Sequence, residues 1–226
     1  AIITEYKAGS HADVIIPKFL HGFPTDEGLL TPRTEIASIY IDQFPAEDIG
    51  RDVAGEFDIP IYPSIVGALT RGGDGLDVDG VLLIGEHGDY PTNDLGQKLY
   101  PRARFFSEIV DVFRADGCAV PVFNDKHLSW NWDWARHMYD QSVELGIPFM
   151  AGSSLPVAWR EPQEILPMGS VIEEALVLGY GGLESYGFHM LETLQCMVER
   201  RQGGETGVRG VQALQGERAW QAQQQG

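Results

Sequence analysis

The chain has few basic residues and an excess of acidic ones. Among 226 residues there are 16 Lys and Arg against 33 Asp and Glu, which gives a formal net charge of −17. A surface this acidic repels a polyanion, so the sequence excludes a protein that binds nucleic acid through a broad basic surface. Long apolar runs are missing as well. Those at residues 81–84 and 175–178 are far shorter than the roughly 20 residues of a membrane-spanning helix, so no membrane partner is expected.

Cysteine is also scarce. Cys118 and Cys196 are the only two, and their spacing fits neither a metal site nor a redox motif. We therefore expect no disulfide framework and a reducing, cytoplasmic location. The chain opens on strand-like residues with no charged-then-apolar signal peptide. With 43% hydrophobic and 22% charged residues, the composition predicts a folded globular protein rather than a disordered acidic chain.

Short β-branched runs alternate with helical periodicity as far as about residue 155, which is the pattern of a parallel sheet with crossover helices. The sequence predicts strands at residues 2–4, 35–41, 59–62, 78–84, 120–123 and 148–151, and helices at residues 10–20, 46–57, 64–69, 103–115 and 132–145. After a cluster of prolines the chain changes to a strand-like run at residues 171–179 and a helix at residues 184–201. We predict an α/β fold with a Rossmann-like parallel sheet in residues 1–156, followed by an abbreviated α+β domain in residues 157–226 that ends in a loosely held tail.

Ionisable residues follow nearly every predicted strand. In an open parallel α/β sheet, ligands bind beyond the carboxyl ends of the strands, because helix N-termini and connecting loops converge there. We therefore expect one functional site at this edge, built from residues 5–11, 42, 85–91, 124–127 and 152–154. Of the other histidines, His11 and His189 can reach the same place, whereas His21 and His137 are interpreted as surface or structural residues.

The run Glu86-His87-Gly88-Asp89 follows one of the buried strands. Two carboxylates and an imidazole within four residues could hold a divalent metal, with His127 near them, and His87 could instead act as a general acid or base. The flanking glycines allow the tight backbone that would direct these side chains to one point. The alternative interpretation is a polar turn in which Asp89 bonds nearby amides.

The run Asn124-Asp125-Lys126-His127 follows the next strand. A lysine held beside a carboxylate at the end of a buried strand can donate a proton or a hydrogen bond to a substrate hydroxyl, so Asp125 and Lys126 are candidate catalytic residues. The alternative is a capping segment with an ion pair. Three tryptophans come next, and they either form a stacking platform for a sugar ring or pack in the core: Trp130, Trp132 and Trp134.

Several segments together resemble the Gfo/Idh/MocA family of oxidoreductases. Residues 56–62 and 78–84 are similar to elements of its Rossmann domain, and Asp125-Lys126-His127-Leu128 occupies the place of the family's Glu-Lys-Pro-Leu segment. Residues 181–192 are similar to the glycine-rich entry into the helix that carries the family's catalytic histidine, which aligns with His189. The resemblance spans most of the chain.

The resemblance implies an oxidoreductase that acts on a sugar, cyclitol or related polyol with NAD(P) as hydride carrier. Lys126 and His189 would then be the proton-transfer residues. The cofactor would be bound by Gly9 and Ser10 of the first loop and by Asp42 at the ribose position.

The sequence also departs from the family. Of the glycine fingerprint only Gly9 remains, Glu5 brings a negative charge to the phosphate loop, and Ser185 stands where the family has an aspartate. Two further hypotheses therefore stay open: a metal-dependent lyase, isomerase or hydrolase on a sugar-like substrate, and a non-catalytic small-ligand-binding protein on a Rossmann scaffold. An incomplete second sheet would leave an apolar face uncovered, which predicts a homo-oligomer.

Overall fold

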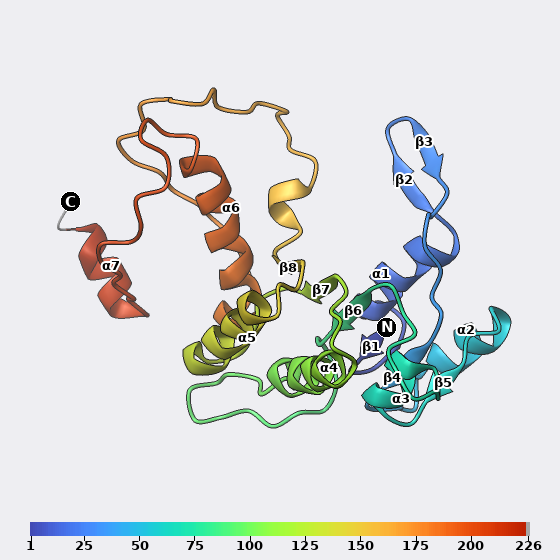
Figure 1. Ribbon diagram of the computed structural model, residues 1–226. Helices are drawn as coiled ribbons and strands as arrows, with labels where there is room; N and C mark the ends of the chain where they lie inside the picture. Colours follow the sequence, from blue (N-terminus) through green and yellow to red (C-terminus); the bar gives the residue numbers. More distant parts are fainter. Residues whose placement is uncertain (225–226) are drawn as a thin grey trace.

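A six-stranded parallel sheet forms the centre of the protein, as seen in a computed structural model that describes residues 1–224 (Figure 1). Its strands are β1 (Ile2–Ile3), β4 (Ile39–Ile41), β5 (Ile61–Tyr62), β6 (Val81–Ile84), β7 (Val122–Asp125) and β8 (Phe149–Gly152), in the order β5-β4-β1-β6-β7-β8. All five neighbouring pairs are parallel. This is the strand order of dinucleotide-binding Rossmann sheets. The first strand is central, and the order in which strands are added to the sheet reverses beside it. The predicted α/β, Rossmann-like fold is confirmed.

Helices cover both faces of the sheet, because side chains alternate along each strand. Ile2 and Leu83 point into one core with α3 (Ile65–Thr70), α4 (Arg102–Asp116) and α5 (Trp132–Glu144). Ile3 and Ile84 point into a second core with α1 (His11–Leu20) and α2 (Gly50–Glu56). Both faces of the central strands are therefore buried, as is usual for a parallel sheet, while Met150 on the edge strand β8 is exposed.

The helices begin where the sequence offers caps. Ser10 precedes α1 and its hydroxyl accepts a hydrogen bond from the Asp13 amide at 3.4 Å, as the capping pattern predicts. Asn131 caps α5 in the same way through the Trp134 amide at 2.8 Å. The loop after β1 leads to the capped start of α1 and the loop after β7 to the capped start of α5, so both helix starts lie at the carboxyl edge of the sheet, where the site is expected.

Some boundaries differ from the prediction. The strand predicted at residues 35–41 is confined to its last three residues, and β7 runs to Asp125, so that Asn124 and Asp125 belong to the strand instead of following it. An antiparallel hairpin of β2 (Phe23–Thr25) and β3 (Gly28–Leu30) was not predicted, and it stands away from the main sheet (Figure 1). It escapes prediction because it has no alternating apolar pattern.

The chain after β8 is mostly irregular. It contains η1 (Leu155–Val157), η2 (Leu183–Gly187), α6 (Phe188–Val198) and α7 (Glu217–Gln223). The helix predicted at residues 184–201 is confirmed in its centre, while α7 falls in the segment predicted as a loose tail. The strand predicted at residues 171–179 is wrong: Val171, Leu176 and Leu178 are exposed, and the described chain beyond Gly152 has no strand to pair with it. No helix among residues 1–224 is long and apolar enough to cross a membrane.

Candidate functional site

A group of ionisable side chains gathers at the carboxyl edge of the sheet, where β6, β7 and β8 end. The central member is Lys126, which follows β7 directly and has a left-handed backbone with φ of 66°. Its side chain is only 7% exposed. The amide of Gly152, the last residue of β8, donates to the Lys126 carbonyl at 2.9 Å, so the neighbouring strand holds this unusual backbone in place.

Two cations bind one carboxylate in this group. Lys126 Nζ lies 3.0 Å from Glu86 Oε1, and the guanidinium of the fully buried Arg102 binds Glu86 Oε2. Burial by itself would raise the pKa of Glu86, but the charges of Arg102 and Lys126 outweigh it and lower the pKa below its ordinary value. Glu86 therefore stays ionised and is shared by the two buried cations.

A segment far along the chain covers Lys126. The ammonium group donates to the carbonyl of Ser185 at 3.2 Å, and Ser185 lies in η2, one turn before α6. In Figure 1 the orange helix α6 rises from the ends of β7 and β8, which agrees with this contact. The polypeptide after residue 180 thus completes the site that the sheet begins.

His189, in the first turn of α6, lies beside the same strand ends. Its Nδ1 is 2.6 Å from the hydroxyl of Ser153, the residue that follows β8, and the Glu192 carboxylate accepts from the Ser153 amide at 3.3 Å. Loss of hydration, and then the charge of Lys126, lower the pKa of His189 below its ordinary value. The imidazole is therefore neutral near pH 7, with Nδ1 held by Ser153 and Nε2 making no hydrogen bond to residues 1–224.

Across from this pair, His11 and Asp125 form a second polar contact. His11 Nδ1 lies 2.5 Å from Asp125 Oδ2, which joins the start of α1 to the end of β7. The His87 ring meets the His11 ring edge to face with centroids 5.0 Å apart. Loss of hydration, and then the charge of His11, lower the pKa of His87. His87 Nε2 is buried with no partner in the described structure, and its backbone has φ of 71°.

His127 sits on the other side of Lys126. Its Nε2 lies 3.4 Å from the Arg102 guanidinium, and its ring packs against Phe188. Loss of hydration, and then the positive charge of Arg102, lower the pKa of His127 to about 4. His127 is thus a neutral acceptor for Arg102 at neutral pH.

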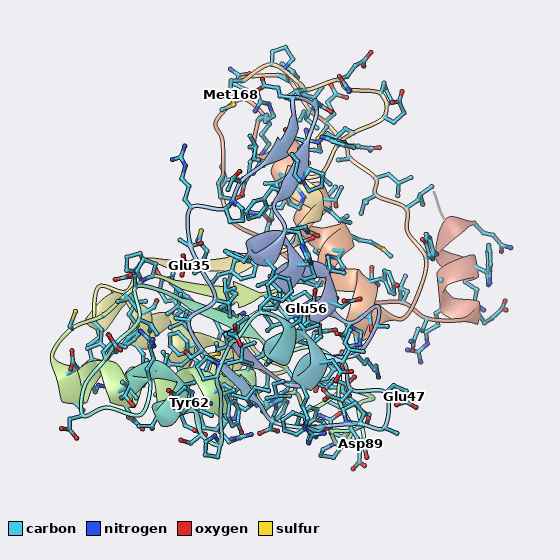
Figure 2. All side chains as sticks on the ribbon, turned by 90° about the vertical axis from the view of Figure 1, so that its right-hand side faces the viewer. Glu35, Glu47, Glu56, Tyr62, Asp89 and Met168 are labelled. Atoms are coloured by element: carbon cyan, nitrogen blue, oxygen red, sulfur yellow. The ribbon has the colours of Figure 1, made fainter. Side chains whose placement is uncertain are left out.

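The four expected metal ligands do not form a ligand set. Glu86 is occupied by two cations, and His127 accepts from one of them. Asp89 lies at the outside of the molecule, and its backbone pairs with Gln43 through bonds of 2.8 and 3.1 Å (Figure 2). Within residues 1–224 no group of three or more His, Cys, Asp or Glu side chains is placed to hold a metal ion. For Asp89 the polar turn is therefore the better interpretation.

The residues expected to bind NAD(P) do not fit it well. Asp42 Oδ1 accepts from the Tyr40 hydroxyl at 2.6 Å and from Arg104 at 3.0 Å, and Oδ2 accepts from the Tyr90 hydroxyl at 2.7 Å, so three of the roughly four acceptor positions of this carboxylate are already used within the protein. Burial would raise the pKa of Asp42, but these bonds lower it. Ser10 is used as the cap of α1. Gly9 has φ of 73°, so a turn requires it, but no neighbouring atom lies within 4 Å of its missing side chain.

The first loop also carries a buried acid. Glu5 is 3% exposed and pairs with Lys7 at 2.6 Å. A carboxylate fixed here would oppose a pyrophosphate at the start of α1. The strand order of a dinucleotide-binding sheet is therefore present without the loop that such a ligand needs.

The sequence missed Arg102 and Glu192, whereas Ser153 lies in the stretch 152–154 that was expected at the site. Arg102 had a signal: it lies on the same helical face as residues 105, 106 and 109, which are all fully buried, and a cation on such a face needs a partner. The contact of Ser153 with Glu192 had no signal, because it joins the end of β8 to a helix 39 residues later. Of the tryptophans, Trp132 is 75% and Trp134 45% exposed, so these two are not core residues.

The fold and the site define a Rossmann-like α/β protein with a buried lysine, a bound carboxylate and neutral histidines at the carboxyl edge of its sheet. Comparisons with protein-family models, with curated proteins and with solved structures gave no match. The resemblance to the Gfo/Idh/MocA family therefore stays a prediction from sequence motifs.

Proposed function

We propose that the cluster around Lys126 and His189 is the active site of an enzyme that moves protons on a small hydroxy- and carbonyl-bearing substrate such as a sugar or cyclitol. The observation that carries the proposal is the contact of Lys126 with Glu86 and with the segment before α6, beside a neutral histidine fixed by Ser153. Burying a cation and orienting an imidazole are costly unless a function uses them. The reaction class is isomerisation, epimerisation or elimination.

The roles follow from the chemistry of each group. Lys126 has three donors, of which two are used by Glu86 and Ser185, so one N–H is left to donate to a carbonyl oxygen. A donated hydrogen bond stabilises the negative charge that develops on that oxygen when a proton leaves the neighbouring carbon. His189 Nε2, unprotonated near neutral pH, is the base that takes this proton and later returns it.

The His11 and Asp125 pair supplies a second acid or base. Asp125 holds His11 Nδ1, which leaves Nε2 as the atom that faces a substrate. An epimerase that removes a proton from one face of a carbon and returns one to the other needs two such groups. We assign these two roles to His11 on α1 and His189 on α6.

An exchange experiment tests this proposal. The protein is incubated in D₂O with aldoses, ketoses and inososes, and deuterium incorporation beside the carbonyl is followed by NMR. We expect exchange with at least one of them, reduced about 100-fold or more in Lys126→Met. Exchange at an unchanged rate in Lys126→Met would contradict the role of the lysine, and no exchange with any substrate would contradict the reaction class.

A nicotinamide-dependent oxidoreductase, as the family resemblance implies, is the second candidate. The strand order favours it, and the bound Asp42 and the buried Glu5 oppose it. Titration with NADH and NADPH, followed by fluorescence, decides between the two. Micromolar binding would favour the oxidoreductase, and no binding at about 1 mM cofactor would remove it.

We also propose that the protein forms homo-oligomers and works in the cytoplasm. Large apolar side chains are exposed throughout the chain after β8, among them Val157, Leu176, Leu178 and Tyr180, all at least 81% exposed. Such surfaces on soluble proteins are commonly covered by a partner. Light scattering after size exclusion is expected to give a multiple of 25.0 kDa, and a mass of one chain at micromolar concentration would contradict self-association.

A further inference from the structure

An open hollow of about 660 Å³ lies next to the candidate active site and is used by none of its roles. It lies between the loop that precedes α4, the first three turns of α4 and the start of α5. Its lining residues are of two kinds, aromatic and charged, and those used below are Tyr90, Tyr100, Trp130, Trp134, Arg104, Glu108 and Asp111.

The charged residues form one row on α4. Arg104, Glu108 and Asp111 are spaced four and three residues apart, which places them on one face of the helix. Arg104 Nη1 pairs with Glu108 Oε1 at 3.0 Å, whereas Asp111 makes no hydrogen bond or ion pair within residues 1–224. The row therefore presents one hydrogen-bond donor group, the Arg104 guanidinium, and two acceptor groups, the Glu108 and Asp111 carboxylates, along the hollow.

The aromatic residues supply flat apolar faces. Tyr90 and Tyr100 meet edge to face with centroids 5.8 Å apart, and the Tyr90 hydroxyl is anchored on Asp42 at 2.7 Å. Trp130 is held from the loop side, where Gln97 donates to its carbonyl at 2.9 Å. Trp134 is 45% exposed although it is large and apolar, so part of its ring is available to a ligand.

We propose that this hollow binds a neutral sugar ring. The C–H face of a pyranose stacks on an aromatic face, while its hydroxyls both donate to carboxylates and accept from a guanidinium, so the mixture of lining groups matches it. A phosphate or other anion is disfavoured by two carboxylates against one arginine. A wholly apolar ligand would strip water from these charges without replacing their hydrogen bonds.

The hollow borders the active site at Tyr100, which packs on the buried Arg102. The Tyr100 ring lies 5.1 Å from the Arg102 guanidinium, which binds Glu86, the partner of Lys126. Trp130 follows Lys126 by only four residues. The inference goes beyond the proposed function, because the hollow is then a second place for a sugar ring, beside the active site and separate from it.

Ligand-observed NMR with methyl β-glucopyranoside, maltose and cellobiose tests the proposal, at concentrations up to about 20 mM. We expect saturation transfer from the protein to at least one of these sugars. Trp134→Ala is expected to weaken binding about tenfold or more, and Asp111→Asn to weaken it less, while Trp132→Ala leaves it unchanged. Trp132 is the matched control, since it is 75% exposed on the same helix and does not line the hollow.

Three results would overturn the proposal: no sugar binding, an equal loss of sugar affinity in Trp132→Ala and Trp134→Ala, or binding of an organic cation such as tetramethylammonium at the hollow in place of sugars.

Repeating the sugar-binding measurement with Lys126→Met separates this inference from the proposed function. Sugar binding that survives in Lys126→Met supports the hollow as a site of its own. Deuterium exchange that depends on Lys126, without any sugar binding at the hollow, would leave the proposed active site standing and overturn the sugar site in the hollow.

Discussion

At the scale of single residues, the site is organised by Arg102, a fully buried cation on a helix whose other buried positions are mostly apolar. Its charge, with that of Lys126, lowers the pKa of Glu86 and keeps it ionised, while burial and then the charge of Arg102 lower the pKa of His127 and keep it neutral; Glu86 in turn holds Lys126. A buried ion network of this kind contributes little net stability compared with apolar residues, but it is costly to break. Its presence is better explained by the need to position a lysine than by folding.

Removing one member of the network tests this account. Arg102→Met leaves Glu86 with one cation instead of two, and we expect the free energy of unfolding to fall by roughly 3–5 kcal/mol. The control is Arg136→Met, which breaks the exposed pair with Asp140 and should cost about 0.5 kcal/mol. Urea denaturation measures both, and equal losses in the two variants would contradict the buried network.

The neutral histidines predict how stability depends on pH. The pKa of His127 is about 4 in the folded chain and 6.5 as the ordinary value, so below pH 6.5 the unfolded state binds the proton first. Stability from this group is present above pH 6.5 and is lost as the pH falls toward 4, amounting to about 2 kcal/mol between pH 7 and pH 5. His127→Asn should reduce the slope of unfolding free energy against pH in this range. An unchanged slope would mean that His127 binds its proton equally in the folded and unfolded chain, which would contradict its lowered pKa.

At the scale of elements, α2 is fixed by a close approach at its first residue. A side chain added at Gly50 would meet Ile41 Cδ1 at 2.7 Å and Tyr6 Cβ at 2.9 Å, so only glycine lets α2 start against the sheet at this place. Tyr6 is itself fully buried in the first strand-end loop. The packing of α2 therefore contributes to the position of that loop.

A pair of glycine substitutions in α2 tests the importance of the close approach at Gly50. Gly50→Ala should destabilise the protein by about 1–3 kcal/mol, because the neighbouring atoms must shift. Gly55→Ala has no atom within 4 Å of the new side chain and should stabilise the helix by about 0.5–1 kcal/mol. Thermal unfolding compares the two variants. A shift of the unfolding temperature in the same direction in both would show that close packing at Gly50 does not determine the effect of the substitution.

At the scale of the whole molecule, most of the sheet and its helices could be predicted because βαβ units carry local signals: β-branched runs, caps such as Ser10, and the apolar stripe of α4. The edge of the sheet that bears the site could also be predicted, because ligands of parallel α/β sheets bind beyond the carboxyl ends of the strands. The segment at residues 171–179 was predicted wrongly because apolar content alone does not provide a partner strand. The contacts of Lys126 with Ser185 and of Ser153 with His189 depend on how distant segments meet, which no local pattern encodes.

The central claim is that Lys126 and His189 act together on a substrate at the carboxyl edge of the sheet. The most direct test is the rate of solvent deuterium exchange into a responsive sugar as a function of pH, in the wild type, in His189→Asn and in the control His137→Asn. The account predicts that the wild type and His137→Asn share a profile that falls on the acid side as His189 is protonated, and that His189→Asn loses about 100-fold in rate along with that limb. A His189→Asn variant that keeps both the rate and the acid limb would contradict the account.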